Sequence, residues 1–331
     1  MKKKWIRKLC FGGFLSLLSL IMICFSILAK HAELYEKTSG DYIHWVDFGI
    51  TAEAMYDALS LDLKSHDGEA PLDWIEALAY LGAKYGGSFS HYKKADLLAF
   101  AEKRQSGTPL AELTHALPYF DYFEEAYRSV LGGFVGDFYL NGEKRYGLIA
   151  FSPIASGYAY NHYDDFGASR SYGYKREHLG HDLMGGVGTP IIAIESGYIE
   201  AIGWNQYGGW RIGIRSFDNK RYYYYAHLRK DHPYAKDFRE GDTVMAGDVI
   251  GYMGRTGYSV KENVNNIDRT HLHFGLQLIF DPSQKDGVNQ IWIDLYEITK
   301  FLSRHRMSVV KSEDGRDYVA KDILLPEGYR D

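Results

Sequence analysis

Residues 270–278 read THLHFGLQL, and this stretch decides how the C-terminal half of the chain folds. Its alternating, β-favouring residues predict a strand rather than a helix. Successive side chains of a strand point to opposite faces, so His271 and His273 share one face while Leu272 takes the other. One rigid strand therefore offers two imidazoles side by side, an arrangement suited to a metal site.

A second group of candidate ligands lies earlier in the chain, in the stretch HLGHD at residues 178–182. A catalytic zinc usually takes three protein ligands, imidazoles and a carboxylate among them, and leaves its fourth tetrahedral position to water. His178, Asp182 and His273 fill these three places.

Two imidazoles then remain without a metal bond, those of His271 and of His227 in the strand-like stretch YYYYAHL at residues 222–228. They are suited to accept the proton of an attacking water and to hydrogen-bond a developing oxyanion. The sequence does not decide which of the two is the base.

Several motifs follow one another between residues 178 and 274: HLGHD at 178–182, GTP at 188–190, ESGYI at 195–199, YAHL at 225–228, EGDTV at 240–244 with AGDVIG at 246–251, and HLHF at 271–274. In these motifs and their order the chain resembles the lysostaphin-type (LytM-type) zinc endopeptidases of bacterial peptidoglycan. The similarity covers roughly residues 152–301.

This resemblance implies one zinc ion per chain, bound by His178, Asp182 and His273, with His227 and His271 as the catalytic pair. It also implies a LytM-type fold with a duplicated hybrid-motif-like β core. The expected substrates are the stem or cross-bridge peptides of peptidoglycan. None of the five residues is replaced, so a zinc metalloendopeptidase is expected; the alternative is a non-catalytic or autoinhibited wall-binding scaffold or activator with the same fold.

His181 offers a different ligand set, because it forms a His-x-x-His pair with His178. The pattern of the family favours Asp182 as the ligand. His181 is therefore expected to be a loop histidine or a residue behind the ligands.

The N-terminus carries a second strong signal, an apolar run without charge at residues 9–29 that follows five basic residues: Lys2, Lys3, Lys4, Arg7 and Lys8. At ~1.5 Å per residue this run is long enough to cross a hydrocarbon core of about 30 Å. A cleaved signal peptide has a shorter apolar region of roughly 7–15 residues. Residues 1–30 are thus predicted to be a cytoplasmic basic stub and a single transmembrane anchor, with the remainder of the chain outside the cytoplasm.

Charge and cysteine usage agree with export of the remaining chain. Residues 1–30 hold 6 of the 38 basic residues and none of the 43 acidic ones, so residues 31–331 carry a formal net charge of −11. Binding to nucleic acid is therefore not expected. Both cysteines, Cys10 and Cys24, lie in the apolar run, so the exported part has no disulfide.

Residues 31–148 predict a small α-helical accessory domain of about four helices, at residues 51–63, 73–81, 95–103 and 120–131. Thr51 is the expected N-cap of the first helix, and Gly86 lies near the expected end of the second. A spacer or lid is the simplest role for this domain. Binding of a glycan or of a protein partner, which the sequence does not identify, is the alternative.

Residues 149–302 predict the peptidase domain, mainly antiparallel β, with strands at residues 191–202, 211–217, 221–227, 249–252 and 271–279. The polar stretch 258–269 is expected to line the substrate groove. Residues 292–302 predict a closing helix, followed by a charged C-terminal tail at 303–331 whose order the sequence does not predict.

Tyrosine is abundant, with 28 residues in 331. The run of four tyrosines at residues 222–225 is expected to be structural, because strand tyrosines pack well in a core. Trp204, Tyr207 and Trp210 are the expected walls of the groove.

Overall fold

The computed structural model describes residues 43–172, 174–285 and 289–329. The transmembrane anchor predicted at residues 9–29 lies outside these ranges. Within the described residues, no helix combines the length and the apolar character needed to span a membrane. Asp47–Asp331 form one unit, to which the elements below belong.

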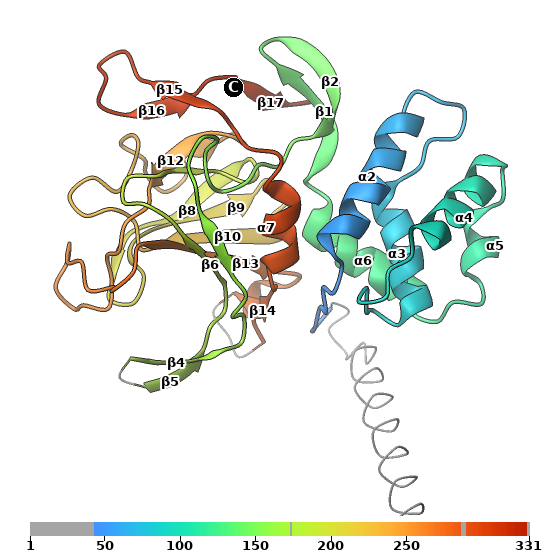
Figure 1. The fold of residues 1–331 in the computed structure, drawn as a ribbon, viewed down its shortest axis with the longest axis horizontal. Helices are drawn as coiled ribbons and strands as arrows, with labels where there is room; N and C mark the ends of the chain where they lie inside the picture. Colours follow the sequence, from blue (N-terminus) through green and yellow to red (C-terminus); the bar gives the residue numbers. More distant parts are fainter. Residues whose placement is uncertain (1–42, 173, 286–288, 330–331) are drawn as a thin grey trace, which may run out of the picture. The chain divides into compact units, whose positions relative to one another are not determined.

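Five helices follow the start of this unit in Figure 1: α2 Ala52–Ser65, α3 Trp74–Tyr85, α4 Lys94–Gln105, α5 Leu110–Thr114 and α6 Phe120–Leu131. The four predicted helices are confirmed, and the short α5 was not predicted. Thr51 caps α2, since its hydroxyl accepts a hydrogen bond from the backbone N–H of Ala54 at 3.3 Å. The chain leaves α3 at Gly86, whose positive φ of 63° suits glycine.

The helical segment ends earlier than the predicted residue 148. Strands β1 (Val135–Leu140) and β2 (Glu143–Leu148) form a hairpin, and β17 (Leu324–Pro326) pairs with β1 to complete a three-stranded antiparallel sheet. Residues 135–148 thus form strands rather than a helix, while the domain boundary at residue 148 stays a prediction.

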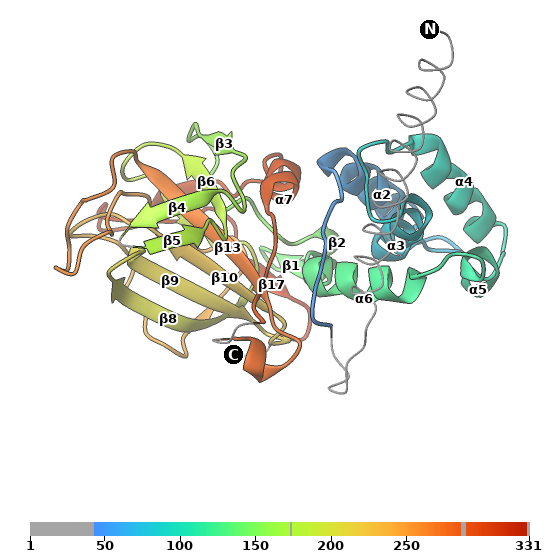
Figure 2. The same cartoon turned by 90° about the horizontal axis from the view of Figure 1, so that it is seen from below.

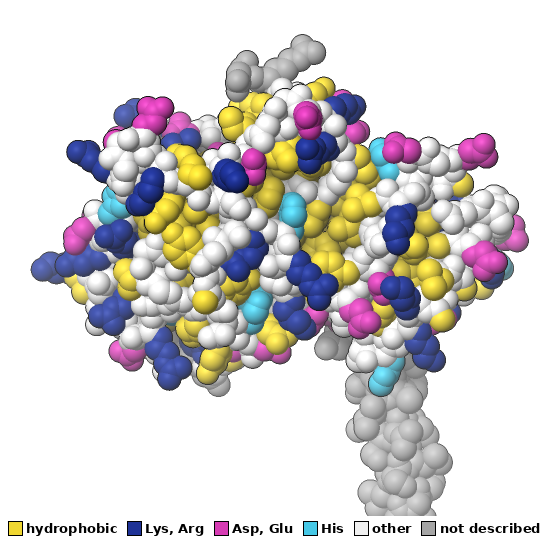
Figure 3. Space-filling view, turned by 45° about the horizontal axis from the view of Figure 1, so that its top comes forward, with side chains coloured by type: hydrophobic (Ala, Val, Ile, Leu, Met, Phe, Trp, Pro, Cys, Tyr) yellow, Lys and Arg dark blue, Asp and Glu magenta, His cyan; other side chains and the backbone are white. Residues whose placement is uncertain are grey.

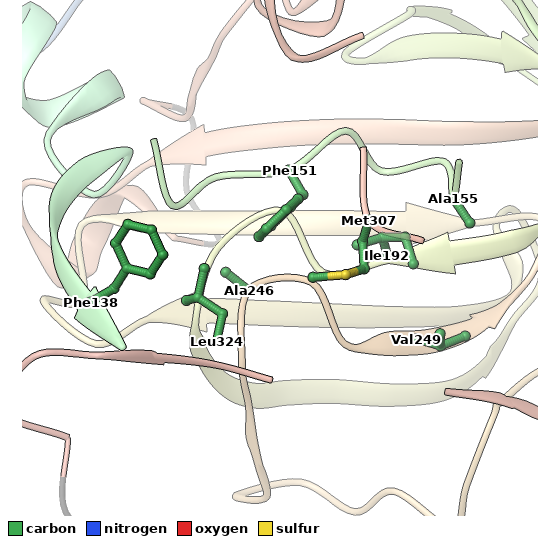
Figure 4. Close-up of a cluster of buried hydrophobic side chains, with 8 residues drawn as sticks. All are labelled: Phe138, Phe151, Ala155, Ile192, Ala246, Val249, Met307 and Leu324. Atoms are coloured by element: carbon green, nitrogen blue, oxygen red, sulfur yellow. The ribbon is translucent and has the colours of Figure 1, made fainter. Parts of the chain in front are cut away.

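The charged tail is folded and belongs to the core. Strands β15 (Val309–Lys311) and β16 (Tyr318–Ala320) form a hairpin between helix α7 (Tyr296–Leu302) and β17. Two residues of the C-terminal tail, Met307 and Leu324, are buried in the hydrophobic cluster drawn in Figure 4. This cluster consists of Phe138, Phe151, Ala155, Ile192, Ala246, Val249, Met307 and Leu324. The C-terminal residues thus pack against the β part of the molecule.

The main sheet has eight strands and runs in the order β11-β8-β9-β10-β13-β6-β3, with β14 paired to β13 (Figure 2). Its pairings are antiparallel, which confirms the prediction of a mainly antiparallel β fold. The strands are β3 Asn161–Tyr163, β6 His181–Met184, β8 Gly197–Asn205, β9 Gly209–Ser216, β10 Arg221–Ala226, β11 Thr243–Val244, β13 His271–Leu278 and β14 Ile291–Trp292.

Two further strand pairs complete the β part: β7 (Pro190–Ile192) with β12 (Val249–Tyr252), and β4 (Ser169–Tyr172) with β5 (Tyr174–Glu177). The closing helix α7 spans Tyr296–Leu302. It begins four residues later than predicted because Trp292 belongs to β14.

A buried ion pair joins the helical segment to the β part. The Arg221 guanidinium donates to both carboxylate oxygens of Glu195, at 2.8 and 2.9 Å, and to the backbone carbonyl of Ser129 in α6, at 2.8 Å. A buried charge is stable only when it is paired and hydrogen-bonded. Helix α2 adds a contact with α7, since the backbone N–H of Ala52 donates to Glu297 at 2.7 Å. On the face shown in Figure 3, basic, acidic and apolar side chains are interspersed.

Candidate metal centre

Strand register brings the histidines of β13 to Asp182 of β6. His273 lies opposite Asp182 and His271 lies opposite Met184. Side chains alternate along both strands, so His271, His273 and Asp182 project from the same face of the sheet. The predicted proximity of these three residues is thus present in the structure.

His178 completes a triangle of ligand atoms. Its Nε2 lies 2.9 Å from Nδ1 of His273 and 3.1 Å from Oδ1 of Asp182, and these last two atoms are 3.1 Å apart. Tetrahedral zinc with bonds of about 2.0–2.2 Å separates its ligand atoms by about 3.3–3.6 Å. The triangle is slightly tighter and has the two-imidazole, one-carboxylate donor set of catalytic zinc sites, so the three residues fit this ion.

Asp165 contacts His178 at Nδ1, the ring nitrogen that does not face the other candidate ligands. Its carboxylate lies 3.0 Å from Nδ1 of His178, and its backbone carbonyl lies 3.2 Å from the same atom. Nδ1 therefore carries the hydrogen and Nε2 keeps its lone pair for a metal. Arg170 pairs with Asp165 and also approaches Asp182 at 3.4 Å. Sequence analysis missed Asp165 and Arg170.

His227 and His271 are each held by a hydrogen bond from Nδ1 to a backbone carbonyl. Nδ1 of His227 donates to the carbonyl of Thr256 at 2.8 Å, and Nδ1 of His271 donates to the carbonyl of Arg269 at 2.8 Å. A carbonyl can only accept, so in each neutral ring Nε2 is the unprotonated nitrogen. The two ring centroids are 4.8 Å apart, and Nε2 of His271 lies 3.7 Å from Oδ1 of Asp182.

The backbone of His227 is in the left-handed region, with φ of 62°. This conformation is unfavourable for a residue other than glycine and is found where the surrounding structure enforces it, often at functional sites. It occurs directly after β10, where the chain turns so that the imidazole faces the metal ligands; the rings of His227 and His273 are 5.9 Å apart.

Burial and neighbouring charges set the protonation of the site. Burial lowers the pKa of His227 well below its usual value, and nearby His271 and His273 lower it further. Burial opposes ionisation of Asp182, but hydrogen bonds with His178 and His273 outweigh it and hold the pKa of this carboxyl well below its usual range. The site thus combines a carboxylate with a neutral imidazole at His227.

His181 lies outside the triangle of candidate ligand atoms. It is the first residue of β6, so its side chain points to the face opposite that of Asp182. There Nε2 of His181 lies 3.2 Å from Nδ1 of His162, and its ring packs on Tyr296. Burial lowers the pKa of His181 to about 3, with a further contribution from His162. His181 therefore lies in a strand and not in a loop, and its position behind the ligands stays a prediction.

A groove of about 930 Å³ opens over the candidate ligands. Residues 266–269 and Tyr258 line it, as predicted for the stretch 258–269, and so does Tyr207. Trp204 and Trp210 are not among its lining residues; their rings pack together at 5.7 Å, so their predicted role as groove walls is wrong.

The tyrosine run divides between core and groove. Tyr223 and Tyr225 are fully buried, as expected for structural tyrosines. Tyr222 and Tyr224 line the groove, a role that sequence analysis missed although strand alternation could have indicated it. Among the described residues that line this groove, none comes from the helical segment, so these helices do not plug the site.

The segment that contains this site is similar to a known protein family. The model of peptidase family M23 matches residues 176–288, the segment that carries the candidate ligands and both further histidines.

Residues 176–288 form a peptidase family M23 domain.

Related sequences are named endopeptidases. The L-Ala–D-Glu endopeptidase of Bacillus subtilis is 38% identical over 124 residues, which are 38% of this chain and 36% of that protein. Lysostaphin of Staphylococcus simulans is 40% identical over 98 residues, 29% of this chain and 17% of that protein. This chain therefore spans about a third or less of the length of these two relatives.

A solved structure from Ruminococcus gnavus, described as a candidate glycyl-glycine endopeptidase lytM, is similar in fold. It has a TM-score of 0.54 and 22% identity, and the alignment covers 80% of this chain and 94% of that chain. The similarity in fold thus extends beyond the M23 segment.

Proposed function

We propose that the protein is a zinc metalloendopeptidase that hydrolyses peptide bonds in the stem or cross-bridge peptides of bacterial peptidoglycan. The observation that carries this proposal is the convergence of His178, Asp182 and His273 on one point, with Nε2 of His227 and His271 facing the same groove. The names of the related endopeptidases support the substrate class. The complete ligand set favours an enzyme over a non-catalytic scaffold.

Zinc bound by these three residues would polarise the scissile carbonyl and make hydroxide available near neutral pH. His271 is the better placed of the two other histidines to carry a proton, because the carboxylate of Asp182 lies 3.7 Å from its Nε2. His227 is buried and stays neutral.

His271 therefore acts as the general base in this proposal: its Nε2 takes the proton from the attacking water and later delivers it to the leaving amine. Nε2 of His227 accepts a hydrogen bond and orients the water. The groove confines the substrate chain beside these groups.

We place the catalytic domain outside the cytoplasm, held to the membrane by the anchor expected at residues 9–29. The basic residues before this apolar run support a cytoplasmic N-terminus. Protease protection in intact cells tests this orientation: an epitope at residue 331 should be digested from outside, and its protection would contradict the proposal.

Release of amino groups from purified peptidoglycan tests the enzymatic proposal. The full-length wild-type chain should release them, whereas His271→Ala should retain zinc and lose the activity. His115→Ala, which changes an exposed histidine outside the groove, is the matched control. A wild-type chain that binds zinc but releases no amino groups would contradict the proposal.

A further inference from the structure

One wall of the groove carries two arginines beside Tyr224. Arg211 lies on β9 and Arg176 on β5, and both line the groove. Burial raises the pKa of Tyr224, while a hydrogen bond from Asn205 and the positive charges of Arg211 and Arg176 oppose this rise. Both guanidinium charges therefore act on the same part of the groove.

Neither guanidinium forms an ion pair with a carboxylate of the described residues. Arg176 lies over the rings of Tyr207 and Tyr258, at 5.0 and 5.3 Å, and donates to the Tyr258 hydroxyl at 2.9 Å. Nε of Arg211 is buried without a hydrogen-bond partner. Both side chains line the groove, so a negatively charged group of a bound ligand would pair with them without displacing a carboxylate of the chain.

Several other charged side chains of the groove form ion pairs. Arg170 pairs with Asp165, and Lys285 pairs with Glu200 at 2.5 Å. Glu200 also pairs with Arg215 at 2.6 Å. Among the described lining residues without an ion pair, Arg176 and Arg211 are half-buried, whereas Glu177, Asp268 and Arg269 are exposed.

Arg176 and Arg211 lie close to two tyrosines, Tyr258 and Tyr224, whose rings neighbour histidines of the candidate metal centre. The ring of Tyr224 is 5.9 Å from that of the ligand His273. The guanidinium of Arg176 lies over the ring of Tyr258, and this ring is 5.9 Å from the ring of His227. A substrate group bound by these arginines would therefore belong to a residue close to the scissile bond.

We infer that Arg176 and Arg211 bind a free carboxylate of the substrate near the scissile bond, and that they make the enzyme selective for acidic stem peptides over glycine bridges. This inference rests on the proposed function, because it names the bond class that the same site cleaves. Guanidinium groups bind carboxylates through directed, charge-assisted hydrogen bonds. A glycine bridge carries no side-chain charge and would leave both arginines unpaired.

Two matched peptides test this selectivity with the full-length, zinc-loaded chain. One is L-Ala–γ-D-Glu–L-Lys with the free α-carboxylate on its glutamyl residue, and the other carries the α-carboxamide instead. The wild-type chain should cleave the carboxylate peptide with a kcat/KM about 10- to 100-fold higher, the range expected for a charge-assisted hydrogen bond. Pentaglycine should be cleaved more slowly than either peptide.

Arg211→Gln and Arg176→Gln should each lower the ratio of carboxylate to carboxamide cleavage toward one. Arg316→Gln, which removes an exposed arginine outside the groove, should keep the wild-type ratio. Thermal unfolding of each variant verifies that it is folded, and Arg176→Gln provides a second test if Arg211→Gln does not fold.

A wild-type ratio near one, a preference for pentaglycine, or an unchanged ratio in both glutamine variants would overturn the inference. Cleavage of purified peptidoglycan in the same preparations separates the two proposals. If peptidoglycan is cleaved but the peptide ratio is near one, only the inferred selectivity fails. If neither peptidoglycan nor any peptide is cleaved, the proposed function fails, and this inference fails with it.

Discussion

Asp165→Asn should weaken zinc binding although Asp165 is not a ligand. The carboxylate of Asp165 lies 3.0 Å from Nδ1 of His178, and the backbone carbonyl of the same residue accepts a hydrogen bond from Nδ1 at 3.2 Å. Both contacts favour the tautomer that leaves Nε2 unprotonated at the site. The substitution keeps the size of the side chain but removes its negative charge. The amide can also donate to Nδ1, which would favour the wrong tautomer of His178.

The expected loss is about 10- to 100-fold in zinc affinity, or about 1.4–2.8 kcal/mol, as found when groups that orient metal ligands are replaced. The side chain of Asp165 is only 11% exposed, so solvent screens its charge weakly. We therefore expect the loss to lie in the upper half of this range.

Equilibrium competition against a chromogenic chelator measures the effect directly. Asp268→Asn is the matched control, because Asp268 is an exposed carboxylate of the same groove and has no contact with a candidate ligand. If Asp165→Asn binds zinc within about twofold of the wild-type chain, well below the loss expected for such a group, the orienting role of Asp165 is refuted.

Three further outcomes are expected. Gly180→Ala should lower zinc affinity by about tenfold or more, because a Cβ there would lie 2.5 Å from Cε1 and 2.7 Å from Nε2 of His273; wild-type binding in the same competition assay would contradict this. Arg221→Met should lower the free energy of unfolding by about 3–5 kcal/mol, since Glu195 would stay buried without its partner; urea unfolding measures it, and a loss below about 1 kcal/mol would argue against the ion pair. Removal of metal by a chelator should abolish release of amino groups, and one equivalent of zinc should restore it; activity that survives complete removal would exclude a zinc mechanism.

The residues of the metal centre could be predicted because their geometry depends on local patterns. The spacing of His271 and His273 places both on one face of any strand. One antiparallel pairing then brings them to Asp182. His178 lies four residues before Asp182, so it needed only a short connection to reach the same point.

The residues that orient and surround this centre could not be predicted in the same way. Asp165 reaches His178 through the turn that precedes β4, a contact set by tertiary structure. The prediction that Trp204 lines the groove was wrong because β8 has a register shift between Ile199 and Ala201. The extra residue at this bulge reverses which side chains of the following part of β8 face the groove.

Long-range pairing explains why the strands β1 and β17 were not predicted. Strand β1 pairs with β17, so Phe138 lies opposite Pro326. The local pattern of a short strand carries little information when its partner is so distant in sequence. The division of the chain at residues 148 and 302 into an accessory domain, a peptidase domain and a tail stays a prediction.

Anomalous scattering at the zinc absorption edge, measured on crystals of the full-length chain, tests the metal centre most directly. We predict one strong peak, within zinc-bonding distance of Nε2 of His178, Oδ1 of Asp182 and Nδ1 of His273. No peak at this position, or a peak between His162 and His181 instead, would contradict the assignment of the ligands and the hydrolytic mechanism built on it.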